Sequence, residues 1–279
     1  MHFHIRKVRL PDDYPAIAAV LNANYPEPTT AERLQGEDAK IPSEGRLGRD
    51  ENGLLTGFDR VKLAAVTDDD LLIGYGLAWR APWTPPGELN HTLVVMPGYD
   101  KQGAGGALYE HLEARARQVG ASRLNYSIKD DKPAYMRFAE KRGYVKERHL
   151  FESVLDLRNG DTPGDEETDR LLEDMQKFGI AFTTLDRLPD DEREKELHAL
   201  YCSTTPDIPG NREAVLPFGE WRKWTLGLPG SRPEYVLLAM DGSRMIGLAH
   251  LIFTPETNSF YHEFTGVNRR GGAAVSRMP

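Results

Sequence analysis

The stretch 89-LNHTLVVMPGYDKQGAGGALYEHLEARARQVG-120 determines how the rest of this sequence is interpreted. Its β-branched and apolar run Thr92–Val95 predicts a strand, which Pro97-Gly98 ends because proline lacks a ladder donor. A helix is predicted to follow, with Gly120 as its C-terminal stop. Its predicted apolar face consists of Ala104, Leu108, Leu112 and Ala116.

The junction between this strand and this helix favours an anion. The first amides of a helix have no internal partner, and the helix dipole is positive there. Glycines at 103, 105 and 106 would let a pyrophosphate approach the backbone with no Cβ in the way. Small residues at such a turn also serve close contact between helix and strand, so the turn alone leaves both interpretations open.

Two motifs in this chain resemble those of the GNAT superfamily of N-acetyltransferases. Val95-x-Pro97, Gly103-x-Gly105 and Ala107-Leu108 resemble motif A of that family. Further along, Pro133 and Phe138-Ala-Glu-Lys-Arg-Gly143-Tyr144 are similar to its closing helix and Gly-Phe/Tyr signature. The resemblance implies an α+β fold, in which helices flank a mixed, mostly antiparallel sheet, with acetyl-CoA as co-substrate.

Length and composition set limits on the kind of protein. The 279 residues suggest two domains, and a net charge of -8 argues against a general nucleic-acid binder. Cys202 is the single cysteine, which excludes an internal disulfide framework and most zinc motifs, and no cluster has metal-ligand spacing. No apolar run is long enough to span a membrane, so we expect a soluble, cytoplasmic protein with no membrane partner.

The chain before and after the central stretch has the expected order of a GNAT-like domain, residues 1–157. Strands are predicted at 3–9, 60–67, 71–80 and 123–128, with one or two more at 144–157. A helix capped by Asp12 or Asp13 follows the first strand, and another covers 132–142. The loop-rich region 25–52, where the resemblance places the acceptor, has one helical hint at 30–34.

A second, partial copy is predicted at 178–279, after an acidic linker and helix at 158–177. A strand at 180–188, a helix after Asp190, a hairpin around Asp241-Gly242 and a strand at 260–267 repeat the order of the first half. Thr265–Gly272 then resembles the entry to another motif A, with no room for its helix. The alternative is an unrelated small α+β domain.

The resemblance implies where acetyl-CoA would bind. The pyrophosphate would lie on the backbone of Lys101, Gln102, Gly103, Ala104, Gly105, Gly106 and Ala107, and the pantetheine along Leu93, Val94 and Val95. Lys132 replaces the usual Asn at the start of the closing helix. Asp100 stands where the family usually has Arg or Gln, and a carboxylate there repels a pyrophosphate.

Candidate catalytic residues follow from the same resemblance. Glu88 and His91, before and at the start of the central strand, are candidates for the base that deprotonates the amine. Ala139 occupies the position of the family's usual tyrosine acid, which makes Tyr135, one turn earlier, a candidate acid, and Tyr126 on the preceding strand is another. A structural role remains the alternative for each of these residues.

The sequence thus predicts an enzyme, an N-acetyltransferase that moves an acetyl group from acetyl-CoA to the amine of a small molecule or peptide. Within this class, the tandem arrangement also resembles mycothiol synthase. The alternative from another class is a catalytically inactive CoA-binding or interaction protein. A homodimer is a further possibility, because the partial second sheet needs a cover.

Overall fold

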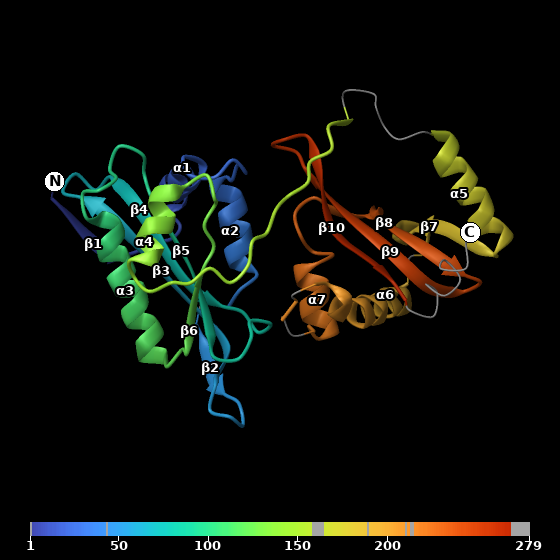
Figure 1. Ribbon diagram of the computed structural model, residues 1–279, viewed down its shortest axis with the longest axis horizontal. Coiled ribbons are helices and arrows are strands. Elements are labelled where there is room, and N and C mark those ends of the chain that lie inside the picture. Colours follow the sequence, from blue (N-terminus) through green and yellow to red (C-terminus); the bar gives the residue numbers. More distant parts are fainter. Residues whose placement is uncertain are drawn as a thin grey trace. The chain divides into compact units, whose positions relative to one another are not determined.

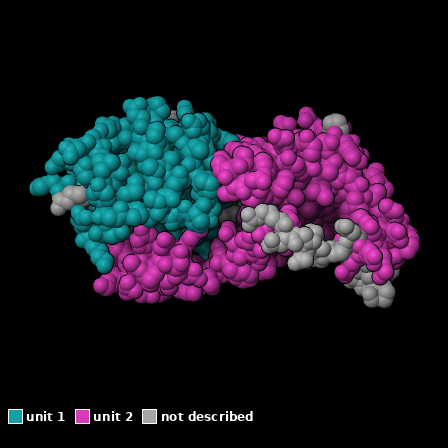
Figure 2. Space-filling model, turned by 90° about the horizontal axis from the view of Figure 1, so that it is seen from above, with its two compact units in different colours: residues 1–127, 212–216 teal, residues 128–211, 217–279 magenta. Residues whose placement is uncertain are grey.

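The computed structural model describes residues 2–42, 44–157, 165–188, 190–209, 211–212 and 215–268 (Figure 1). The chain divides into two compact units, Met1–Ser127 with Arg212–Leu216 and Ile128–Asn211 with Pro217–Pro279 (Figure 2). Each unit has a sheet of its own, and helices flank both sheets, as predicted for an α+β fold. No helix within the described ranges is long and apolar enough to cross a membrane.

The sheet of the first unit confirms the predicted mixed, mostly antiparallel arrangement. Its strand order is β1-β3-β4-β5-β6, with β2 paired to β3. Only β5 and β6 are parallel, because the chain crosses from one to the other through a helix. The strands are β1 (Phe3–Lys7), β2 (Arg46–Arg49), β3 (Leu55–Thr67), β4 (Leu72–Arg80), β5 (Glu88–Val95) and β6 (Arg123–Tyr126).

Helices cover both faces of this sheet. Val94 belongs to a core cluster with Ile17 and Val20 of α1 (Tyr14–Asn22), whereas Val95 lies beside the start of α3 (Ala104–Val119). Because neighbouring strand residues point to opposite faces, α1 and α3 cover opposite faces of β5. Gly120 ends α3 with φ of 71°, as predicted from the sequence.

Helix α2 (Ala31–Ala39) extends the helical hint at 30–34, and Thr30 caps it by accepting a hydrogen bond from the Arg33 amide. Asp38 near its end forms ion pairs with Arg60 and Lys62 of β3. Desolvation by burial lowers the pKa of Lys62 despite this partner. These two ion pairs hold α2 against β3 of the sheet.

The second unit contains a four-stranded antiparallel sheet, in the order β10-β9-β8-β7. The predicted strand, capped helix, hairpin and strand of this half are all found, and their order repeats that of β1, α1, β3–β4 and β5. Residues 158–164 of the predicted linker and residues 269–272 of the predicted second motif lie outside the described residues. The elements are α4 (Pro133–Glu140), α5 (Asp165–Lys177), β7 (Ile180–Thr184), α6 (Asp191–Thr204), α7 (Phe218–Trp224), β8 (Ser231–Asp241), β9 (Arg244–Thr254) and β10 (Ser259–Val267).

The prediction of strands at 144–157 is wrong, since no strand lies in that segment. Val145, Phe151 and Val154 are 87%, 85% and 90% exposed. Apolar residues come as adjacent pairs here, Leu150-Phe151 and Val154-Leu155, so no strand register puts them all on one face.

The structure divides the chain after Ser127, and the predicted domain boundary at 157 stays a prediction.

Candidate active site

The turn before α3 has an unusual backbone conformation. Lys101 has φ of 60° and Gly103, the N-cap of α3, has φ of 96°, both in the left-handed region. The first hydrogen bond into the helix runs from the Ala107 amide to the Gly103 carbonyl, at 3.0 Å. The amides of Ala104, Gly105 and Gly106 precede it and have no acceptor within the helix.

Space around Gly105 distinguishes the two interpretations of the glycine-rich turn. A Cβ at Gly105 would meet Val95 Cγ2 at 3.5 Å, which is ordinary van der Waals contact. Close contact between α3 and β5 therefore does not require glycine at 105. Gly103 is different, because its positive φ disfavours any side chain. The contact with β5 therefore does not explain why residue 105 is glycine.

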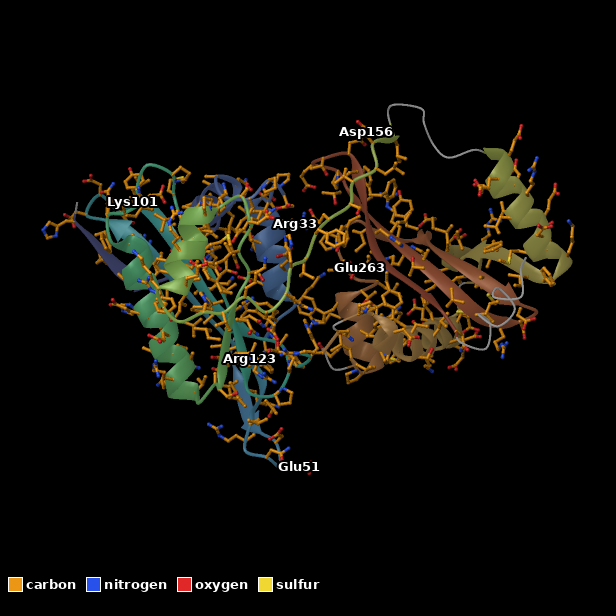
Figure 3. All side chains as sticks on the ribbon, in the orientation of Figure 1. Arg33, Glu51, Lys101, Arg123, Asp156 and Glu263 are labelled. Atoms are coloured by element: carbon orange, nitrogen blue, oxygen red, sulfur yellow. The ribbon has the colours of Figure 1, made fainter. Side chains whose placement is uncertain are left out.

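Strands β5 and β6 separate beside this turn. Their parallel pairing covers Glu88–His91 of β5 and Arg123–Tyr126 of β6, and β5 continues to Val95 without β6 beside it. Figure 3 labels Lys101 near the start of α3 and Arg123 at the start of β6. The space left beside the second half of β5, where β6 no longer pairs with it, is called the gap below.

Backbone groups of β5 alternate between β4 and this gap. The Met96 amide donates to the Ile73 carbonyl at 2.8 Å, so in the antiparallel ladder Val94 also turns its amide and carbonyl to β4. Leu93 and Val95 turn theirs to the gap. Of the three predicted pantetheine contacts, Leu93 and Val95 therefore present backbone amides there, whereas the backbone of Val94 belongs to the β4 ladder.

Glu88 is a buried carboxylate, 8% exposed, at the start of β5. Asn125 Nδ2 donates to its Oε2 at 2.8 Å, and Arg212 forms an ion pair with it. Arg123 Nη1 is 3.9 Å from Glu88 Oε1. These partners hold the carboxylate in place at the start of β5.

His91 is buried on the opposite face of β5, at 3% exposure. Its ring stacks on Tyr126 with centroids 4.3 Å apart and meets the edge of Tyr109 of α3 at 6.1 Å. Burial lowers the pKa of His91 to about 4, so the imidazole is neutral at neutral pH. The structure therefore does not bring Glu88 and His91 together, although both lie on β5.

The two predicted site residues on the closing helix belong to the second unit. Lys132 is the N-cap of α4, and Tyr135 lies half-buried in its first turn. Ala139, in the position of the family's usual tyrosine, is 5% exposed. The prediction that Tyr135 is the acid stays a prediction.

Sequence reasoning missed the polar residues around Glu88. Asn90 and Asn125 lie on its face of the sheet, with Asn125 Nδ2 3.3 Å from Asn90 Oδ1. The alternation of Glu88 and Asn90 along β5 was visible in the sequence, but the pairing of β5 with β6 was needed to bring Asn125 beside them. Arg212, more than a hundred positions further along the chain, gave no signal of this contact.

The chain is similar to known acetyltransferases in part of its sequence and in its fold. The family model "Acetyltransferase (GNAT) family" matches residues 21–144, which include β3 to β6, α3 and α4. No curated protein matches the sequence.

Among solved structures, a GCN5-related N-acetyltransferase from Sphaerobacter thermophilus is similar over 98% of this chain and 79% of its own, with a TM-score of 0.62 and 17% identity. The glucosamine N-acetyltransferase region of a fungal multi-domain β-N-acetylglucosaminidase aligns with 96% of this chain and 32% of that protein, with a TM-score of 0.62 and 15% identity. At these identities the likeness shows the fold. The family model matches residues 21–144, a little under half of the chain, and that segment is similar to the GNAT acetyltransferases.

Proposed function

We propose that this protein is an acetyl-CoA-dependent N-acetyltransferase that acts on the amine of a small molecule or peptide. Two neighbouring features of the backbone support this proposal best. The left-handed turn at Lys101–Gly103 opens α3 directly after β5, the strand that separates from β6. A pyrophosphate on the turn would let the rest of a CoA chain lie along the gap.

In this proposal the amides of Gln102–Gly106 donate to the pyrophosphate and Lys101 adds a positive charge. The amides of Leu93 and Val95 donate to the pantetheine, which then adds to β5 as a strand would. Lys132 at the start of α4 would also serve CoA, because the family match extends through this helix. We accordingly place the acetyltransferase domain at 1–157, and the partial second copy at 178–279.

The chemistry is a direct transfer. The acceptor ammonium loses a proton, and its nitrogen then attacks the thioester carbonyl carbon. A C–N bond forms, the C–S bond breaks, the nitrogen loses its second proton as it becomes an amide, and the departing sulfur takes up a proton. Glu88, held in place by Asn125 and Arg212, is the proposed base, acting directly or through water. Tyr135 remains the proposed acid.

A cavity of about 290 Å³ lies between α1 and α2, and Glu88 is not among the residues that line it. It contains two carboxylates, Glu27 and Glu37, which favour a cationic amine, although Arg33 pairs with Glu37 at 3.2 Å. Desolvation and the nearby Glu27 raise the pKa of Tyr25 in its wall. The other lining residues are Leu21, Pro28, Thr29 and Leu34.

Two observations favour the alternative, a CoA-binding protein without catalysis. Asp100 is exposed in the turn and adds a negative charge near the proposed pyrophosphate, and Ala139 offers no hydroxyl where the family has one. Binding without turnover would support this alternative.

The experiment is a calorimetric titration of acetyl-CoA into wild type, Gly105→Glu and Gly105→Ala. A Cβ fits at 105, so we expect both variants to fold and Gly105→Ala to bind at nearly wild-type strength. Gly105→Glu should lose binding, because its carboxylate enters the pyrophosphate site. Equal affinity in all three proteins would contradict the proposal. An amine screen for thiol release then distinguishes enzyme from binding protein.

A further inference from the structure

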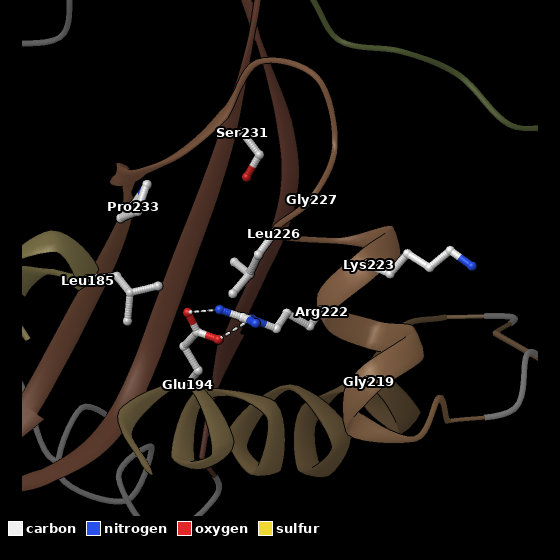
Figure 4. A pocket seen from close by; sticks show the side chains of 9 residues that line it. All are labelled: Leu185, Glu194, Gly219, Arg222, Lys223, Leu226, Gly227, Ser231 and Pro233. Carbon is white, nitrogen blue, oxygen red and sulfur yellow. Dashed lines mark hydrogen bonds and ion pairs between the residues drawn. The ribbon is translucent and has the colours of Figure 1, made fainter. Parts of the chain in front are cut away.

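A cavity of about 450 Å³ lies in the second unit, outside the proposed acetyl-transfer site. This volume falls in the range of ~300–1,000 Å³ that is usual for small-molecule sites. The cavity lies between α6, α7 and the start of β8 (Figure 4). Its walls are Leu185, Glu194, Gly219, Arg222, Lys223, Leu226, Gly227, Ser231 and Pro233.

An ion pair forms the polar centre of this cavity. Arg222 Nε lies 2.6 Å from Glu194 Oε2, and Arg222 Nη2 lies 3.4 Å from Glu194 Oε1. The two charges cancel, yet the guanidinium keeps N–H groups and the carboxylate keeps lone pairs that this pair does not use. The centre of the cavity therefore offers donors and acceptors side by side with no net charge.

Lys223 does not change this balance. Its side chain points away from the other lining residues in Figure 4. Its Nζ lies 3.9 Å from Glu220 Oε2 and 5.5 Å from the centre of the Trp224 ring. An anionic ligand at the centre would meet the Glu194 carboxylate, and a cationic ligand would meet Arg222, so either net charge is opposed.

Ser231 adds a hydroxyl that points into the cavity (Figure 4). Its Oγ lies 2.9 Å from Nε2 of His250, which is 1% exposed behind it. Burial lowers the pKa of His250 to about 4, so the ring is neutral at neutral pH. A neutral imidazole nitrogen either donates to or accepts from the hydroxyl, and in both cases the hydroxyl retains hydrogen-bonding capacity toward a ligand.

Leu185, Leu226 and Pro233 give the cavity an apolar wall. A ligand that matches the whole cavity is neutral, has several groups that both donate and accept, and presents C–H surface on one side. We propose that this cavity binds a neutral polyhydroxylated ligand, a monosaccharide or the sugar end of a glycan. Its hydroxyls would donate to Glu194 and accept from Arg222, and its C–H face would lie on Leu226.

The test uses the full chain and a panel of neutral hexoses, pentoses and methyl glycosides. Maltose is included to represent the sugar end of a glycan. Saturation-transfer NMR detects contact, and calorimetry gives affinity, with inorganic phosphate and acetate as anionic probes. We expect saturable binding of a neutral sugar that weakens at least tenfold in Glu194→Ala, since hydrogen bonds to charged groups are the strong ones. Phosphate binding should strengthen in the same variant, because Arg222 is left unpaired.

Two further variants keep the test independent of folding. Leu226→Trp fills the cavity without leaving a charge unpaired, and it should also weaken sugar binding at least tenfold. Asp241→Asn, which removes an exposed ion pair with Arg244 elsewhere in the same unit, is the matched control and should bind as wild type. Absence of saturable binding across the sugar panel would overturn the proposal. So would sugar binding that survives both cavity variants, or wild-type phosphate binding stronger than that of every sugar.

Discussion

Glu88 and His91 lie three positions apart on β5, and their side chains leave the sheet on opposite faces. Glu88 faces the same side as Asn90 and Asn125, and His91 faces Tyr126 and Tyr109 of α3. One acceptor amine cannot use both groups directly. The structure therefore separates two candidates that the sequence presented as equivalent.

If Glu88 is the base, Glu88→Gln should lower kcat by about 10²-fold or more while leaving the Kd of acetyl-CoA unchanged. The amide is similar in shape but accepts no proton. Thiol release against pH measures the rate, and calorimetry measures binding. Glu113→Gln, at a half-buried position of α3 where the carboxylate pairs with Arg117, is the matched control. Unchanged kcat in Glu88→Gln would remove Glu88 from the mechanism.

Arg212 should act as a positioning residue for Glu88. Arg212→Leu removes the ion pair and leaves a buried carboxylate that binds protons more readily, so the pH at half-maximal rate should move upward. Arg212→Lys keeps the charge and should restore much of the wild-type profile. A lower rate with an unchanged profile in Arg212→Leu would mean that the contact only supports the fold.

Stability should depend on pH through His91. Its folded pKa, about 4, is below the ordinary value of about 6.5, so the unfolded chain binds more protons between these values. Stability from this group is present above pH 6.5 and is lost as pH falls toward 4. We expect His91 to contribute about 2 kcal/mol to the loss of stability between pH 7 and pH 5.

Urea unfolding of wild type and His91→Phe at both pH values measures this effect. Phenylalanine keeps the stack on Tyr126, so the variant should lose about 2 kcal/mol less than wild type. His4→Phe on β1, at an exposed position, is the control. An equal loss in wild type and His91→Phe would show that His91 does not cause the pH dependence.

Lys101 should lower the stability of the fold and strengthen the binding of acetyl-CoA. Its φ of 60° disfavours a side chain, so Lys101→Gly should stabilise the fold by up to about 1 kcal/mol. The same change removes a cation beside the proposed pyrophosphate, so acetyl-CoA should bind several-fold more weakly, with less dependence on salt. Lys101→Ala should lose the same affinity without the stabilisation. Full affinity in both variants would place the ammonium away from the phosphates.

Asp100→Arg should tighten acetyl-CoA binding, more so at low salt, because it replaces a repulsive charge with an attractive one. Titrations at two ionic strengths measure this. Asp100→Asn, which only removes the charge, should lie between wild type and the arginine variant. If neither variant binds more tightly than wild type, the carboxylate points away from the phosphates.

Local patterns predicted much of the first unit. The run Thr92–Val95, the glycines and the stop at Gly120 predicted β5, the turn and α3, because each signal depends on neighbouring residues. The segment 144–157 was misinterpreted for the same reason: β-branched and aromatic residues indicate a strand locally, but a strand also needs a partner edge.

The site was harder to predict than the fold. The glycine-rich turn at 101–107 is one continuous stretch, whereas the surroundings of Glu88 come from β5, β6 and Arg212. No local pattern indicates that Arg212 contacts Glu88. Only the register of β5 against β4 shows that Leu93 and Val95, and not Val94, face the gap.

The separation of β5 from β6 has a consequence for amide hydrogen exchange. Thr92 and Val94 donate toward β4 within a central ladder, whereas Leu93 and Val95 turn their N–H groups to the gap. Exchange along this strand should therefore alternate between slow and fast at successive residues, a pattern that a fully paired strand would not give. A molecule that fills the gap and accepts from both amides would slow the fast positions alone, so the strand itself would report occupancy residue by residue.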